Sequence, residues 1–157
     1  MASVEACAGC GLELPGGTFA CYARFEELLA LEFGDARFFR VHRLTVDTYA
    51  VQHPERHCVS PTSFTAHLTG LCATMEHEDP VAVNARVQRW LSTKPDLEKP
   101  SLPVARGRRT IADVTNTDDP AVYVDQVRRW GRSAWEAFAD LHPIAREWIR
   151  RSMDQRR

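Results

Sequence analysis

The sequence lacks any stretch that approaches the roughly 18 consecutive apolar residues needed to cross a bilayer. Its N-terminus has no basic segment followed by an apolar run, which a secretory signal would show. Net charge is also nearly absent, at −1 with neutral histidines, which argues against a general attraction to nucleic acid or anionic lipid. We therefore expect a cytoplasmic protein that makes no membrane contact and does not bind nucleic acid.

The chain also lacks an even number of cysteines: with five, they cannot all pair in disulfides. An odd number without a secretion signal argues against a disulfide framework. Cys7, Cys10 and Cys21 crowd into the glycine-containing N-terminal stretch, whereas Cys58 and Cys72 stand apart. We interpret the first three as a set and Cys72 as a small core residue.

What the sequence does have is the composition of a folded protein. It is 157 residues long, with 44% hydrophobic and 26% charged residues. This length is enough to bury a core but short for two independent cores. We expect a single helical domain over 1–157.

Apolar residues recur at three-to-four spacing through most of the chain, which is typical of amphipathic helices. Ser-Pro and Asp-Pro pairs mark several helix starts. The expected helices cover 19–34, 36–53, 80–92 and 120–141, with further helices starting at 61 and 143. Thr18 is the expected N-cap of the first helix. The predicted fold class is all-α, an antiparallel helical bundle of about five to six helices with an N-terminal cysteine-rich metal knuckle.

Three segments depart from this regular helical pattern. Residues 36–53 contain several β-branched side chains, so a strand stays open as an alternative for part of them. Residues 1–18 are expected to be a loop fixed by a metal, because burial alone cannot offset its ordering entropy. Residues 93–118 form a long connection with prolines and arginines and one helical turn expected at 110–114. Connections of this length are often functional or wrap over the body of a domain.

The spacing Cys7-x-x-Cys10, followed by Cys21 near the start of the first helix, supplies three thiolates. A structural zinc ion is held by four tetrahedral ligands, so one more must come from elsewhere. If the first two helices are antiparallel, the start of one lies beside the end of the other, where His53 falls. His42 would lie about 16 Å further along the axis at 1.5 Å per residue. We predict a Zn²⁺ site formed by Cys7, Cys10, Cys21 and His53.

Other interpretations remain open for these residues. His57 and Cys58 follow His53 closely enough to replace it as the fourth ligand. Cys7 and Cys10 are alternatively free surface thiols in a flexible tail. They are also candidates for a redox pair, although the strand-then-helix context typical of that motif is missing. His53 is alternatively a C-terminal cap that binds helix carbonyls.

A second group of polar residues falls in the middle of the same stretch. If the helix over 36–53 packs antiparallel to the next one, residues whose numbers sum to about 114 lie at one level. Asp47 and His67 meet this condition, and His42 is a further candidate. A carboxylate on one imidazole nitrogen fixes the tautomer, as a metal site or a general base requires. The simpler interpretation is a buried hydrogen bond between two helices.

Three motifs stand out along the chain: Cys7-x-x-Cys10-Gly11, residues 42–54 (HRLTVDTYAVQHP) and Ala66-His67-Leu68. With them the chain resembles an uncharacterised family of small bacterial proteins of unknown function. The likeness extends over nearly the whole chain, as far as the Arg-Arg-Trp pattern at 128–130 and Trp-Glu-Ala at 135–137. The resemblance implies no activity. It marks these motif positions without roles: Cys7, Cys10, Cys21, His42, Asp47, His53 and His67. His57 and Cys58 fall outside the pattern, which weakens them as ligands.

The favoured function is a zinc-binding helical protein whose metal is mainly structural and which binds a protein or small-molecule partner, with the 93–118 connection as a candidate surface. The alternative is a metal-dependent, hydrolase-like enzyme. In it, His42, Asp47, His53 and His67 hold a catalytic metal with an open position for water. Duplex DNA binding by the arginine-rich C-terminal helices is a third interpretation. The sequence leaves open whether the protein is an enzyme and what its oligomeric state is.

Overall fold

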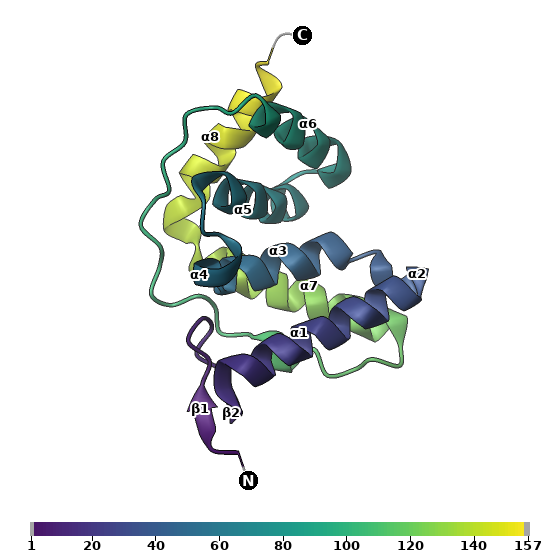
Figure 1. The fold of residues 1–157 in the computed structure, drawn as a ribbon. Coiled ribbons are helices and arrows are strands. Elements are labelled where there is room, and N and C mark those ends of the chain that lie inside the picture. Colours follow the sequence, from purple (N-terminus) through teal and green to yellow (C-terminus); the bar gives the residue numbers. More distant parts are fainter. Residues whose placement is uncertain (1, 156–157) are drawn as a thin grey trace.

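The computed structural model describes residues 2–155, which are mostly helical with one small two-stranded sheet (Figure 1). The elements in chain order are β1 (Val4–Ala6), β2 (Glu13–Pro15), α1 (Gly17–Gly34), α2 (Ala36–Phe39), α3 (His42–Gln52), α4 (Pro54–His57), α5 (Pro61–Glu76), α6 (Pro80–Ser92), η1 (Ile111–Asp113), α7 (Pro120–Ala137), η2 (Ala139–Leu141) and α8 (His142–Met153). The expectation of a mostly helical protein is confirmed. The N-terminal hairpin is the exception to the all-α class.

The hairpin of β1 and β2 carries the Cys-x-x-Cys knuckle in its loop. The strands pair antiparallel, with Glu5 opposite Leu14. The Cys7 N–H donates to the Leu12 carbonyl at 2.8 Å and closes the loop. The expectation of an irregular loop over 1–18 is wrong, because strands of three residues are too short to show an alternating pattern.

α1 begins earlier than expected, and Thr18 is not its N-cap. The N-cap is Gly16, whose φ of 89° lies in the left-handed region that favours glycine. The Thr18 hydroxyl instead accepts a hydrogen bond from the Ala8 N–H at 2.9 Å. This contact ties the knuckle to the start of α1, the helix that carries Cys21.

The segment expected as one helix over 36–53 is helical but divided into α2 and α3. Residues 40–41 separate the two helices. Phe38 of α2 is buried and packs edge-on against Tyr123 of α7, a contact made across the molecule. The strand alternative is excluded, and the division reflects tertiary packing that local propensity does not reveal.

The later helices begin where the sequence indicated. Ser60 caps α5 with Pro61 in the first turn. Asp79 and Asp119 cap α6 and α7 by accepting hydrogen bonds from backbone N–H groups. α7 is shorter than expected, because the 3₁₀ turn η2 intervenes before α8.

α5 lies at the centre of the helical part. Its neighbours are α3 on one side and α6 and α8 on the other, and α1 lies on the far side of α3 (Figure 1). The largest fully buried side chains come mainly from α3, α5 and α7 and include Tyr49, Phe64 and Trp130. Within residues 2–155, no helix combines the length and the apolar character needed to cross a membrane.

The connection between α6 and α7 runs along one side of the molecule to the hairpin end (Figure 1). The buried Gln52 side chain holds it there. Its Nε2 donates to the carbonyls of Arg106 (2.9 Å) and Arg109 (2.8 Å), and its Oε1 accepts from Trp130 Nε1 at 2.9 Å. The turn expected in 110–114 is present as η1. The connection is therefore fastened to the helices along its second half.

Candidate metal centre

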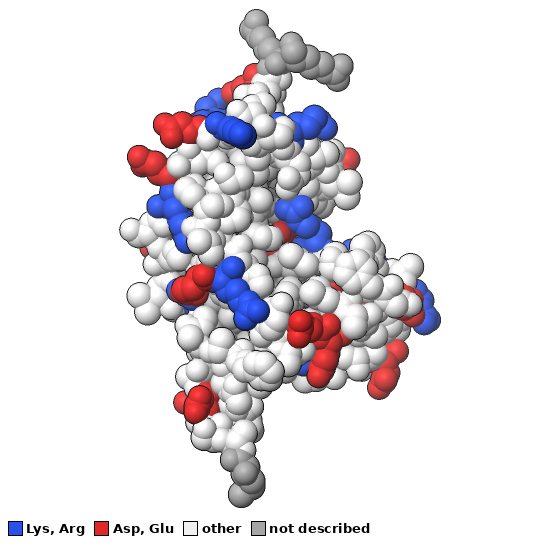
Figure 2. All heavy atoms as spheres, viewed as in Figure 1, with Lys and Arg blue, Asp and Glu red and all other residues white. Residues whose placement is uncertain are grey.

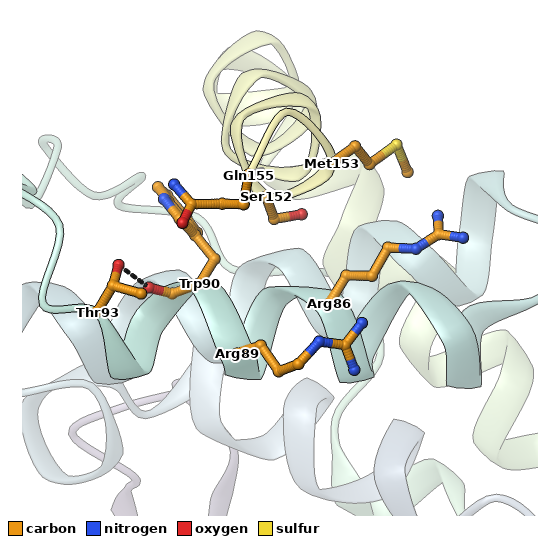
Figure 3. A pocket seen from close by; sticks show the side chains of 7 residues that line it. All are labelled: Arg86, Arg89, Trp90, Thr93, Ser152, Met153 and Gln155. Carbon is orange, nitrogen blue, oxygen red and sulfur yellow. Dashed lines mark hydrogen bonds between the residues drawn. The ribbon is translucent and has the colours of Figure 1, made fainter. Parts of the chain in front are cut away.

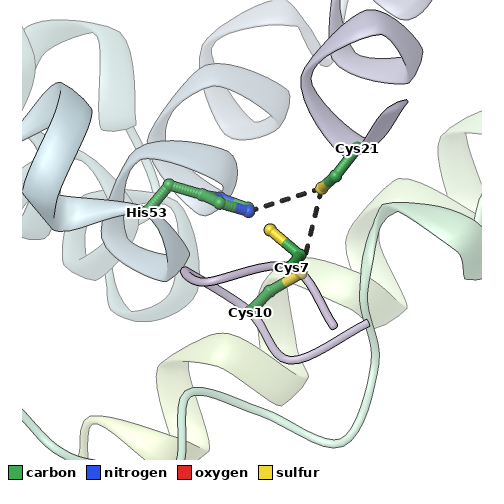
Figure 4. A group of neighbouring side chains, drawn as sticks. All are labelled: Cys7, Cys10, Cys21 and His53. Carbon is green, nitrogen blue, oxygen red and sulfur yellow. Dashed lines mark hydrogen bonds between the residues drawn. The ribbon is translucent and has the colours of Figure 1, made fainter. Parts of the chain in front are cut away.

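Four side chains from three parts of the chain meet at the hairpin end of the molecule (Figure 4). Cys7 and Cys10 come from the hairpin loop, Cys21 from the start of α1, and His53 directly follows α3. Their ligand atoms all lie within 4.8 Å of one another. Cys10 is half-buried, the other three are buried, and the cysteines are free thiols. These four residues could therefore hold a metal ion.

Two distances within the group match those around a tetrahedral ion. Cys10 Sγ and Cys21 Sγ are 3.9 Å apart, and Cys21 Sγ is 3.5 Å from His53 Nε2. Zinc with bonds of about 2.3 Å to sulfur and about 2.0 Å to nitrogen separates two sulfurs by roughly 3.8 Å and sulfur from nitrogen by roughly 3.6 Å. An ion of this size would need little movement of these side chains.

His53 is oriented by a hydrogen bond on the far side of its ring. Its Nδ1–H donates to the Tyr49 carbonyl at 2.7 Å, and this leaves Nε2 directed at Cys21 (Figure 4). Such a bond fixes the tautomer of a histidine ligand. His53 can therefore act both as a helix cap, through Nδ1, and as a metal ligand, through Nε2.

Tyr49 contacts two members of the group, Cys21 and His53. Its hydroxyl lies 3.5 Å from Cys21 Sγ, and its ring stacks between Phe25 (4.0 Å) and His53 (3.8 Å). Burial and the contact with Cys21 raise the pKa of Tyr49, so the hydroxyl keeps its proton and can donate to a thiolate. Tyr49 is buried, so its hydroxyl meets Cys21 rather than solvent.

The neighbouring thiols change each other's protonation. Hydrogen bonds from the Cys21 thiol and from His53 lower the pKa of Cys10 to about 4, although burial opposes them. The contact with Cys10, together with burial, raises the pKa of Cys21. Cys10 is therefore the first of this pair to become a thiolate, the form that binds metal.

The knuckle approaches His53 too closely for a side chain to fit between them. A Cβ atom on Gly9 would lie 2.4 Å from His53 Cδ2. The Gly9 carbonyl accepts a hydrogen bond from Arg106 Nη1 at 2.9 Å, and Arg106 also pairs with Glu55. The connection between α6 and α7 thus closes over the knuckle. Sequence reasoning missed Gly9, although its place between the two cysteines was an available signal.

The other candidates for a fourth ligand lie outside the group. His57 packs among aromatic rings of α1 and α3, and burial lowers its pKa to about 4. Cys58 donates to the Ala50 carbonyl at 3.5 Å, and burial raises its pKa to about 12. His42 lies at the first position of α3, at the opposite end from His53, and contacts Glu32 of α1. Of the residues considered, His53 is the one that joins the three cysteines.

The contact predicted between Asp47 and His67 is present. His67 Nδ1 donates to Asp47 Oδ1 at 2.9 Å, and Arg43 Nε donates to Asp47 Oδ2 at 2.7 Å. Asp47 is buried, so the arginine compensates a charge that water cannot reach. Gly70 leaves the space for it, since a Cβ atom there would lie 2.1 Å from Asp47 Oδ2.

His42 has a buried carboxylate partner that sequence reasoning missed. Glu32 accepts hydrogen bonds from His42 Nδ1 (2.8 Å), the Tyr123 hydroxyl (2.7 Å) and the Thr45 hydroxyl (2.5 Å). The available signal was its position on the buried face of α1, one helical turn beyond Leu28. Asp47 with His67 and Glu32 with His42 are thus two carboxylate–imidazole pairs.

The enzyme hypothesis placed His42, Asp47, His53 and His67 around one catalytic metal. His53 lies with the cysteines instead, away from the other three. Within residues 2–155, the cysteine group is the one set in which three or more such ligand atoms converge. His42, Asp47, His53 and His67 therefore do not converge on one metal position.

Comparison with known proteins agrees with the resemblance seen in the sequence. The family of unknown function DUF5946 matches residues 5–139, which is most of the chain, and the chain therefore belongs to this family. The match includes the four candidate ligands and both carboxylate–imidazole pairs. No curated protein and no solved structure gave a significant match.

Proposed function

We propose that this family member binds one zinc ion through Cys7, Cys10, Cys21 and His53, and that the metal is mainly structural. The observation that carries the proposal is the convergence of three thiols and one imidazole to within 4.8 Å of one another. Thiolate and imidazole ligands in a tetrahedron favour zinc over hard cations such as magnesium or calcium. The contacts of Tyr49 with two of the ligands are of the kind that orients metal ligands.

A structural role follows from what the four residues connect. β1 and β2 are short and mostly exposed, and an isolated two-stranded hairpin is marginally stable at best in water. A metal held by the hairpin loop, by α1 and by the end of α3 would fix the hairpin to the helices. Four protein ligands leave no open position on the metal, which is the arrangement of structural rather than catalytic zinc sites.

We also infer where the protein works and how its parts divide the task. Thiolates that bind metal must stay reduced, which suits the cytoplasm. We place residues 1–157 in a single domain, an antiparallel bundle whose activity is binding a protein or small-molecule partner. The 93–118 connection has a covering role in this scheme, because Gln52 and Arg106 hold it against the knuckle.

A metal-dependent hydrolase is the second candidate. The observation in its favour is a groove lined by both His42 and His67. Both oxygens of Asp47 are already hydrogen-bonded, to His67 and to Arg43, which leaves this carboxylate poorly placed to bind a metal as well. The structural zinc proposal therefore has the stronger support.

The test is the metal content of protein purified under reducing conditions. We expect about one zinc ion per chain, and less than about a tenth of this in Cys7→Ser and His53→Ala, because each removes a ligand from a four-coordinate site. Cys72→Ala and His77→Ala remove the same residue types outside the group and should keep the metal. Reduced wild-type protein without near-stoichiometric zinc would contradict the proposal.

A further inference from the structure

A groove between α3 and α5 forms a second candidate site, away from the cysteines. Its volume is about 320 Å³. It is lined from α3 by His42, Arg43 and Val46, from α5 by Ser63 and His67, and from α6 by Gln88. Figure 2 shows the molecule hollowed between α5–α6 and α1–α3. The size is that of a pocket for a small molecule.

Both imidazoles of this groove are held in the same way. Nδ1 of His42 is bonded to Glu32 at 2.8 Å, and Nδ1 of His67 to Asp47 at 2.9 Å. A carboxylate only accepts, so each Nδ1 carries a hydrogen and each Nε2 is left for another partner. Neither Nε2 makes a hydrogen bond to residues 2–155, and the side chains are 22% and 23% exposed.

The carboxylates beside the groove are buried, whereas the Arg43 side chain is partly exposed. Glu32 and Asp47 are fully buried, and the groove lining contains no acidic residue. Arg43 uses Nε on Asp47 and Nη2 on the Ala66 carbonyl, which leaves Nη1 without a protein partner among the described residues. When such an imidazole is protonated, its Nε2 carries a hydrogen and becomes a second donor. Arg43, together with each imidazole once it is protonated, therefore supplies donors suited to an anion.

We propose that this groove binds a small anionic ligand through a phosphate or carboxylate group, with Arg43 and the Nε2–H groups of His42 and His67 as donors. Two pairs that served only to join helices would not need both imidazoles to line one groove. No residue that lines the groove belongs to the cysteine group.

The test is a titration of the full-length, metal-analysed protein with inorganic phosphate and, separately, with acetate, followed by NMR of ¹⁵N-labelled histidines. The Nε2 signals of His42 and His67 are expected to shift together with one dissociation constant. Those of His77 and His142, outside the groove, should stay in place. Tighter binding of phosphate assigns a phosphate ligand, and tighter binding of acetate assigns a carboxylate ligand.

Variants separate the groove from other basic surfaces. His42→Gln and His67→Gln should each weaken binding about tenfold, the loss expected for one charge-assisted hydrogen bond. Arg89→Gln is the matched control, because it removes a cation from a different pocket, between α6 and α8, where Arg86 and Arg89 extend into solvent (Figure 3).

Two results would overturn the proposal. One is wild-type protein in which neither groove histidine responds to either anion at concentrations of tens of millimolar. The other is binding lost in Arg89→Gln and kept in His67→Gln, which would place the anion between α6 and α8. Should a variant fail to fold, the wild-type histidine shifts decide the question alone.

Discussion

Gly9 sets how closely the knuckle approaches His53. Because a Cβ atom would lie 2.4 Å from His53 Cδ2 and 3.0 Å from the Gln52 carbonyl oxygen, no side chain fits here without moving backbone or ring. Gly9→Ala should therefore shift either the Cys7–Cys10 loop or the imidazole. We expect zinc affinity to fall by about tenfold or more, as for changes that displace a metal ligand through its surroundings. Competition with a chromogenic chelator measures it.

The control for this substitution is Gly34→Ala, because a Cβ atom there would meet nothing within 4 Å. It should bind zinc as tightly as the unaltered protein. Equal affinities for Gly9→Ala and Gly34→Ala would show that the close packing of Gly9 on His53 does not support metal binding.

Single residues differ in how far the sequence reveals them. The contact of Asp47 with His67 followed from counting levels on two antiparallel helices, because that register is a local consequence of a short loop. Sequence reasoning did not single out Glu32, whose burial is accompanied by hydrogen bonds from Thr45 of α3 and from Tyr123 of α7. Partners supplied by distant elements cannot be deduced from helical spacing alone.

The hairpin is the element that depends most on the proposed metal. Its strands have three residues each and little buried surface of their own. Removing the metal should therefore release β1 and β2 while α5 and α6 stay folded. Hydrogen exchange of the chelated protein is expected to accelerate strongly at the Cys7 amide and across 4–15, with little change in α5. Uniform acceleration in all helices would instead indicate that the metal supports the entire fold.

Elements with local start signals were predictable. The Ser60-Pro61 and Asp79-Pro80 pairs place a cap and a first-turn proline together, and the helices begin there. The break at 40–41 and the hairpin strands lack such signals. The first accompanies the packing of Phe38 on Tyr123, and the second comes from pairing across the knuckle.

The five cysteines divide into two environments across the whole molecule. Three lie in the candidate metal centre, whereas Cys58 and Cys72 are buried among the helices, where burial raises the pKa of each to about 12. We expect no rapid reaction of metal-loaded protein with a disulfide reagent at pH 8. After chelation three thiols should react, and the last two should react only in denaturant.

Mass spectrometry of the labelled protein identifies which thiols reacted at each step. Labelling of Cys58 or Cys72 before denaturation would mean that the helical core opens together with the knuckle. Rapid labelling of Cys21 without a chelator would argue against a bound metal.

The covering of the knuckle by Arg106 also sets an order in time. All candidate metal ligands lie at or before His53, whereas the arginine that closes over Gly9 comes 53 residues later. At a synthesis rate of about 5–20 residues per second, that delay is roughly 3–10 s. During this interval the nascent chain exposes a complete ligand set without its cover. An ion bound in this interval would meet an uncovered site, over which Arg106 would later close on the Gly9 side.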